Sequence, residues 1–332
     1  MNYSINMRAA ARGYQATLKL VRKYAILLIL GSLILFFSFL SPYFATRQNL
    51  MNILVQQSHV VIAAVGLSFV MISGGMDLSV GNQISLVGVA TSVLMMWHDL
   101  PIPLAIAAGI LIGIALGLFN GFAVIKLNVH PLIVTLGTMN IFSGISYMIS
   151  KQSLILNLPA AFKFIGQGYL FDLIPFSVIL MLITVLVAAF LQNKTYLGKY
   201  IYAIGSNEEA ALLAGVNVTL VKLLVFALCG FFVSIAAIVL FARSGSAAST
   251  IGSGTEFTAI AAAFLGGISF TGGEGRIWAL VAAVFILGVL HNGMQLIGIG
   301  TYAQYVVKGF VFLAAVGFDV RHKQLFFRRK TA

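Results

Sequence analysis

Long runs of apolar residues follow one another along the chain, and each has about the length that crosses a bilayer. A membrane-spanning helix needs about 20 predominantly apolar residues. The runs are continuous rather than alternating, which disfavours a strand barrel. The pattern predicts an all-α, polytopic transmembrane bundle of about ten spans, at residues 24–40, 53–73, 80–97, 103–124, 131–149, 173–191, 219–241, 256–272, 277–297 and 301–318.

Composition supports this class. Of the 332 residues, 60% are hydrophobic and only 8% are charged, whereas a soluble domain carries about 25% charged residues. The eight acidic residues are too few to cover the surface of a water-soluble protein of this length. A soluble fold, a disordered chain and a disulfide scaffold are excluded. One cysteine, Cys229, and scattered histidines also make a metal site unexpected.

Basic residues orient the spans. With a cytoplasmic N-terminus and ten spans, most Lys and Arg residues fall inside and only Arg47, Lys151, Lys163 and Arg243 fall outside. Both termini are therefore predicted to be cytoplasmic. The net charge of +12 is explained by orientation and contact with membrane lipid, not by nucleic-acid binding. The domain assignment is a cytoplasmic lead (1–23), a transmembrane domain (24–320) and a basic cytoplasmic tail (321–332).

Two glycine-rich segments interrupt the apolar pattern, GGMDLSVG at 74–81 and GGISFTGGEG at 266–275. Non-helical backbone at membrane depth survives only inside protein or beside a watery cavity. They are either two tight cytoplasmic turns or hinges that border a translocation path. A possible internal repeat pairs the glycines of the two segments, aligning Gly74, Gly75 and Gly81 with Gly266, Gly267 and Gly273.

Polar residues inside apolar spans are costly and need a reason. Amides and hydroxyls outnumber carboxylates there, which suits a path for a neutral, hydroxyl-rich solute, although interhelical hydrogen bonding explains any one of them singly. Other polar positions in the spans include Gln56, Gln57, His59, Gln83, Asn140, His291, Gln304 and Lys308. The candidate path or hinge residues are Gly74, Gly75, Asp77, Ser79, Gly81, Asn82, Asn120, Gly272, Gly273, Asn292 and Gln295.

A stripe of small residues marks the fourth predicted span. The members recur every four residues and so share one helix face. Such a face lets another backbone approach closely, which favours packing over a pore-lining role. The stripe consists of Ala105, Gly109, Gly113, Gly117 and Gly121.

The longest polar stretch on the predicted inner side, residues 192–218, holds a short helix signal. Ser206 or Asn207 can cap the helix and Gly215 can end it. Its acids fall in the first turn, and its leucines, Leu212 and Leu213, are available to a partner. The coupling candidates are Glu208, Glu209, Ala210, Ala211 and Gly215; the alternative is a solvated connecting helix.

This E-A-A-x-x-x-G pattern resembles the coupling motif of permease subunits in binding-protein-dependent ABC importers, with Glu209 as its acid. The segments GGMDLSVG, GKYIYAIGSNEEAALLAGVN and LGGISFTGGEGRI extend the resemblance to ribose-type permeases, which serve ribose, xylose, galactose and autoinducer-2. It covers about residues 24–319. It implies a permease that moves a sugar or sugar-like solute across the bacterial inner membrane by alternating access. It also implies an ATP-binding cassette subunit, a second permease subunit (identical or different) and an extracytoplasmic solute-binding protein.

The chain contains no G-x-x-x-x-G-K-[ST] phosphate-binding loop, so ATP and Mg²⁺ are expected on the partner subunit and no cofactor on this chain. It is therefore not expected to be an enzyme. An ion-coupled secondary transporter remains an alternative. That class needs a mid-membrane carboxylate or an unwound ion site, whereas Asp77, Glu256, Glu274 and Asp319 all fall at predicted span ends. A membrane scaffold is a third reading.

Overall fold

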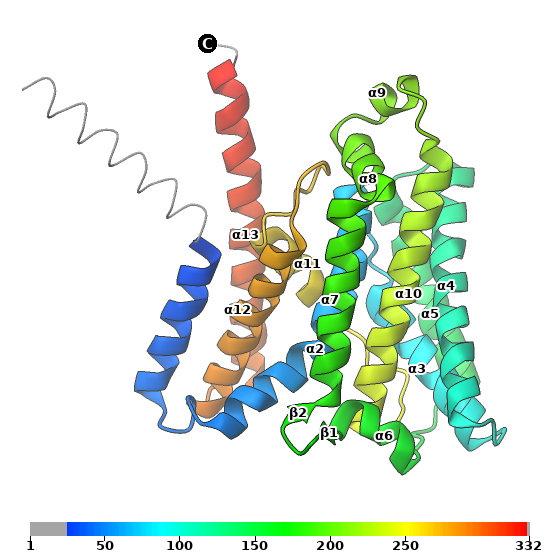
Figure 1. Cartoon of the computed structure of the whole chain (residues 1–332), viewed down its shortest axis with the longest axis vertical. Helices are drawn as coiled ribbons and strands as arrows, with labels where there is room; N and C mark the ends of the chain where they lie inside the picture. The colour runs from blue at the N-terminus through cyan, green and yellow to red at the C-terminus, as the bar shows by residue number, and fades with distance from the viewer. Residues whose placement is uncertain (1–24, 331–332) are drawn as a thin grey trace, which may run out of the picture.

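A computed structural model describes residues 25–330, apart from the side chains of residues 315, 316 and 318–330. Most of its helices run roughly along one axis (Figure 1). The predicted lead, 1–23, lies outside the described residues. The helices are Ala25–Leu40, α2 (Arg47–Ile72), α3 (Val80–Met96), α4 (Ile102–Leu127), α5 (Pro131–Ser150), α6 (Ala160–Gln167), α7 (Phe176–Lys194), α8 (Tyr196–Ser206), α9 (Glu208–Leu213), α10 (Val218–Ser244), α11 (Thr255–Leu265), α12 (Ile277–Leu296) and α13 (Thr301–Lys330).

Among the described residues, six helices are long and apolar enough to cross a membrane: α2, α4, α5, α7, α10 and α12. Three shorter apolar helices accompany them: Ala25–Leu40, α3 and α11. The chain is thus a polytopic helical membrane protein. Every predicted span contains a helix, but these lengths do not establish ten crossings, and the span count stays a prediction.

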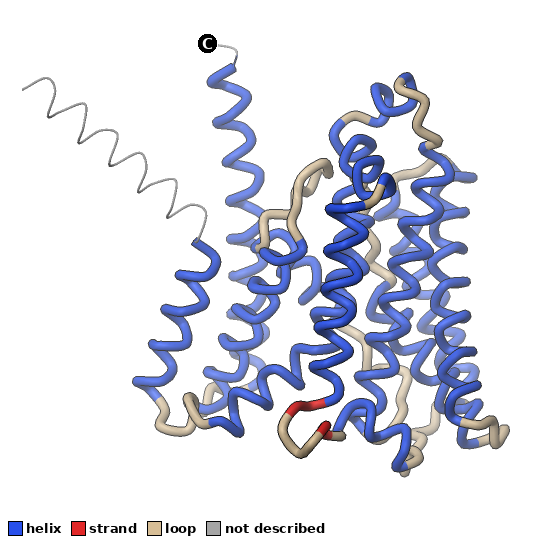
Figure 2. Tube along the Cα trace, viewed as in Figure 1, coloured by secondary structure: helices blue, strands red, loops and turns tan. Residues whose placement is uncertain are grey.

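The structure corrects two details of the prediction, the end of the eighth span and the all-α assignment. The eighth predicted span extends to residue 272, but α11 stops at Leu265; its 11 residues rise only about 16 Å. The all-α assignment misses a small antiparallel hairpin, in which β1 (Tyr169–Leu170) pairs with β2 (Ile174–Pro175) before α7 begins (Figure 2). An isolated bridge joins Ile155 to Ala247. The last helix, α13, continues to Lys330, through most of the predicted tail.

Helix α2 is the centre of the bundle. Every residue from Gln57 to Ile72 is buried, as expected for a helix that is apolar on all sides and enclosed by protein. It packs against α10, α12, α7 and α11. A change in the conformation at the end of α2 would therefore reach most of the molecule.

Gly113, Gly117 and Gly121 of the small-residue stripe of α4 pack against α10, and Gly109 packs against Thr91 of α3, which confirms the packing interpretation. All five of its members are buried, whereas large apolar side chains elsewhere on α4, such as Leu111 and Phe122, are exposed. A Cβ added at Gly113 would lie 2.7 Å from the carbonyl oxygen of Gly230 on α10. The glycines therefore allow direct backbone contact between two long helices.

Four of the described helices end in the same way, with a glycine in the left-handed conformation. The glycines are Gly74 after α2 (φ +89°), Gly215 after α9 (φ +84°), Gly267 after α11 (φ +77°) and Gly298 after α12 (φ +80°). In each case the glycine N–H and the next N–H bond back to the last turn, the Schellman arrangement. Gly74 thus corresponds to Gly267, one residue away from the predicted alignment with Gly266; the internal repeat itself stays a prediction.

The two ends of the bundle differ in the segments they carry. Helix α9 lies at one end, here called the α9 end, together with residues 73–79, the turn between α4 and α5, and residues 266–276 (Figure 1). Helix α6 and the β1–β2 hairpin lie at the opposite end, here called the hairpin end. Both glycine-rich segments therefore lie beside the predicted coupling helix.

Candidate functional site

Helix α9 presents two leucines to its surroundings. Asn207 caps it, accepting the N–H of Ala210 on its side-chain oxygen at 2.9 Å, so Asn207 rather than Ser206 is the N-cap. Ala211 is buried against the bundle, while Leu212 is 61% exposed and Leu213 is 88% exposed. The helix is fixed on one face and open on the other, as a docking helix requires.

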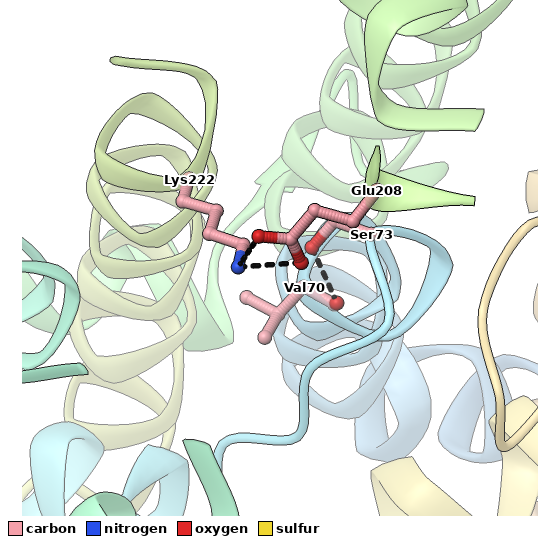
Figure 3. Close-up of polar contacts among 4 residues, drawn as sticks. All are labelled: Val70, Ser73, Glu208 and Lys222. Atoms are coloured by element: carbon pink, nitrogen blue, oxygen red, sulfur yellow. Dashed lines mark hydrogen bonds and ion pairs between the residues drawn. The ribbon is translucent and has the colours of Figure 1, made fainter. Parts of the chain in front are cut away.

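An ion pair holds α9 to the body of the protein (Figure 3). The Lys222 ammonium on α10 lies 2.7 Å from both carboxylate oxygens of Glu208. Beside it, the Ser73 hydroxyl donates to the Val70 carbonyl at 2.8 Å, where α2 ends. The sequence pointed to Glu208 but not to its partner, because the two residues lie in different helices. Glu209, the acid assigned to the motif, is exposed.

We expect Glu208→Lys to lower both the free energy of unfolding and uptake, because it places two ammonium groups together. Half-exposed pairs contribute at most about 1 kcal/mol, so the expected loss of ATP-coupled uptake is at most about fivefold. The double variant Glu208→Lys/Lys222→Glu restores the pair with its charges exchanged and should recover both quantities. Uptake and thermal melting of the purified protein measure this; a double variant no better than the single one contradicts it.

Behind α9, four glycines from three segments meet in what we call the glycine junction: Gly74, Gly205, Gly272 and Gly273. The Gly273 N–H donates to the Ile72 carbonyl, the last of α2, at 2.8 Å. A Cβ at Gly272 would lie 2.7 Å from the Cα of Gly74, and one at Gly205 would overlap the Ile72 carbonyl oxygen. Both predicted breaks therefore touch each other and the end of α8.

Residues 266–276 are also tied to α7 and α8. The Tyr202 hydroxyl on α8 donates to the Gly275 carbonyl, and the Gln192 side-chain oxygen on α7 accepts the Ile277 N–H at 3.3 Å. Burial raises the pKa of the Tyr202 phenol, although the charge of Arg276 opposes the rise, so the phenol keeps its proton at neutral pH. A displacement of α8 would thus pull on both glycine-rich segments.

The first segment also contains a buried polar cluster. Asp77 accepts the Ser79 N–H at 2.8 Å and its hydroxyl at 2.6 Å, and further bonds from Gln83 and Asn120 at 3.2 Å each. The carboxylate is fully buried. It therefore joins the start of α3 to α4. The sequence identifies Gln83 only as a polar span residue, because its place beside Asp77 depends on the turn before α3.

The remaining candidates lie elsewhere. Gly81 packs against the Glu256 carboxylate, and Asn82 accepts from Ser253 at 3.2 Å. Asn292 exchanges two amide hydrogen bonds of 2.9 Å with Asn49 at the start of α2. Gln295 is exposed. The candidate set is therefore spread from the α9 end to the opposite end of α2 and does not gather in one place.

A polar cavity of about 480 Å³ lies between α2, α11, α12 and α13, and the end of α10. The carbonyl of Arg243 accepts from Gln167 on α6, which places this part of the cavity toward the hairpin end. Its polar lining includes Gln56, His59, Arg243, His291, Tyr305 and Lys308. Four of these, Gln56, His59, His291 and Lys308, are polar span residues outside the predicted path candidates, and Arg243 is one of the predicted outer charges.

A family model described as the branched-chain amino acid transport system permease component matches residues 49–316. The chain belongs to this permease family. The permease is a transport subunit rather than an enzyme, and ATP hydrolysis takes place on a separate subunit. The sequence-based resemblance to ribose-type permeases is confirmed by the relatives described next.

Curated relatives match the permease over most of its length. The D-allose transport system permease protein of Escherichia coli (strain K12) is 39% identical over 298 residues, 90% of this chain and 91% of the relative. The ribose import permease protein of the same strain is 39% identical over 301 residues, covering 88% and 92%. A xylose transport system permease protein from Haemophilus influenzae is 30% identical over 362 residues, covering 91% and 96%. No solved structure matches.

Proposed function

We propose that this permease carries a sugar or sugar-like solute across the bacterial inner membrane as part of an ABC importer. The observation that carries the proposal is the connection of α9, with its exposed leucines, to the glycine junction. A docking helix attached to the ends of α2 and α11 can transmit motion into the bundle. The names of the relatives, which cite allose, ribose and xylose, support a monosaccharide as the solute class.

The proposed topology has about ten spans with both termini cytoplasmic, which puts the α9 end in the cytoplasm. Segregation of charge supports this orientation. The predicted inner residues Lys126, Lys199 and Lys222 belong to elements at the α9 end, and the predicted outer residues Lys163 and Arg243 lie near α6. Such a bias follows the positive-inside rule.

The proposed mechanism is alternating access driven by an ATP-binding subunit that holds ATP and Mg²⁺. Closure of that subunit pushes α9 and α8, and the glycine junction passes the movement to α2 and α11. Left-handed glycines suit such a hinge because glycine, without a Cβ, can change between backbone conformations that other residues rarely adopt. Four of the candidate path and hinge residues, Gly74, Gly75, Gly272 and Gly273, belong to the proposed hinge at the α9 end. The proposed solute path is the polar cavity toward the hairpin end, which residues outside the candidate set line.

Three partners complete the proposed assembly: the ATP-binding subunit at α9, a solute-binding protein at the hairpin end, and a second permease. Charged residues in lipid are costly, and the polar cavity opens beside exposed residues of α11 and α13, such as Phe257 and Tyr305. A second permease over this face would shield the cavity from lipid. Nothing in these contacts distinguishes an identical second copy from a related chain.

The test is uptake by the reconstituted assembly. We expect concentrative uptake of a neutral monosaccharide only when ATP, the ATP-binding subunit and the binding protein are all present, and no ATPase activity from the permease alone. An ionophore that dissipates proton and sodium gradients distinguishes ATP-driven uptake from the ion-coupled alternative. That alternative is worth testing because Asp77 and Glu256 are buried carboxyl groups. Uptake that survives without ATP but stops with the ionophore would contradict the proposal.

A further inference from the structure

The polar cavity toward the hairpin end holds two fixed positive charges, and no described carboxylate lines it. Arg243 enters from the end of α10 and Lys308 from α13. His59 of α2 and His291 of α12 add further nitrogen groups. The nearest acid on the lining helices, Glu256, packs its carboxylate against Gly81 on α3 and accepts the Gly254 N–H at 3.0 Å.

The positive charges have no counter-charge within the described part of the chain. The buried Nη1 of Arg243 has no hydrogen-bond partner there, and Lys308 lies 5.9 Å from the ring centre of Tyr305 without an ion pair. His59 is only 8% exposed, and its Nδ1 is also unpartnered. Buried charges that the protein leaves unpaired project their field into the adjoining space. The cavity is therefore electropositive.

The cavity also has the position and size of a solute passage. Its lining includes residues of α2, α10 and α12, three of the helices long and apolar enough to cross a membrane. Its volume of about 480 Å³ lies within the range of small-molecule sites. It lies away from α9, toward the end where the binding protein would deliver solute. On the proposed function, a neutral sugar would cross this space on its way through the membrane.

We infer that Arg243 and Lys308 form a charge filter, which admits neutral solutes and repels cations from the translocation path. The inference rests on the proposed function. An importer that opens a polar path through an energised membrane must keep protons and metal cations from following the solute. A fixed arginine or helix-dipole charge excludes cations from other polar membrane pores by the same electrostatic repulsion. The two residues therefore determine specificity by charge.

The test measures cation flux in vesicles that contain the whole importer and hydrolyse ATP. Rubidium efflux and proton entry are compared for the wild type, Arg243→Gln, Lys308→Gln and the double variant. A unit charge within about 10 Å of the path changes cation flux by roughly tenfold at a protein's effective dielectric constant. We expect at least that rise for the double variant and low flux for Arg243→Lys and Lys308→Arg. Lys163→Gln, which removes a charge on α6 outside the cavity lining, should also keep low flux.

Two results would overturn the filter. One is a double variant with wild-type cation flux; the other is equal leakage from the charge-conserving variants, which would indicate a packing defect. Uptake of a neutral monosaccharide in the same vesicles tests the proposed function separately. If the wild type took up no sugar while the double variant still leaked rubidium, the proposed function would fail and the filter would stand.

Discussion

Substitution of Gly205 by valine is expected to abolish uptake. A Cβ added at Gly205 would overlap the carbonyl oxygen of Ile72 and would lie 2.5 Å from the backbone nitrogen of Gly273. Both atoms belong to the hydrogen bond that joins the ends of α2 and the second glycine-rich segment. Neither backbone can move away without breaking that bond, so the junction would separate. Overpacking of this kind typically costs about 1–3 kcal/mol, and more where backbone is involved.

The measurement is ATP-dependent uptake together with thermal melting of the purified complex. A matched control is Gly144→Val in α5, since a Cβ at Gly144 has no neighbour within 4 Å and the backbone there is helical. We expect the control to keep wild-type uptake, because valine meets no neighbour there and has a higher helix propensity than glycine. Wild-type uptake by Gly205→Val would show that the close approach at the junction is not needed.

Replacement of Leu213 by aspartate is expected to prevent assembly with the ATP-binding subunit. At 88% exposure Leu213 contributes almost nothing to the fold of the permease itself, so its apolar surface is free for a partner. Apolar anchors buried in an interface commonly contribute about 2 kcal/mol or more, which corresponds to roughly thirtyfold in affinity. A carboxylate in the same pocket would also have to lose its water. The expected result is a permease that inserts and melts normally but gives no ATP-driven uptake.

Co-purification with the ATP-binding subunit measures this effect directly, and Leu212→Asp should give a smaller loss in the same direction. The matched control is Leu156→Asp, an exposed leucine between α5 and α6, far from α9. It should leave the amount of co-purified ATP-binding subunit unchanged. Normal co-purification of Leu213→Asp would remove the reason for assigning α9 to coupling.

Local patterns in the sequence were sufficient to find most of the elements. Apolar length located a helix in every predicted span, and the four-residue repeat of small residues identified the packing face of α4. The capping residue and terminal glycine of α9 are also visible in the sequence, because both act within one turn. The exception was α11, where the apolar run continues past Gly266 although two glycines end the helix.

Long-range partners could not be found in this way. Gly205 is one of 33 glycines, and only its contact with Ile72 distinguishes it from the others. In the sequence, Lys222 and Arg243 serve only to orient the spans, Lys222 as a predicted cytoplasmic charge and Arg243 as a predicted outer charge. Their roles depend on which helix faces which, and in an apolar chain many helix pairings satisfy the same hydrophobic pattern.

The sequence by itself determined the class of protein and most of the helices, and it predicted the coupling segment, because hydropathy, capping and charge bias act locally or through the membrane. Only the tertiary structure decided that the two glycine-rich segments meet behind α9, that Glu208 rather than Glu209 is anchored, and that two cations share a cavity. Those facts depend on close approach between residues far apart in the chain. Such an approach is decided by steric fit and hydrogen bonding between backbones, which the order of residue types does not reveal.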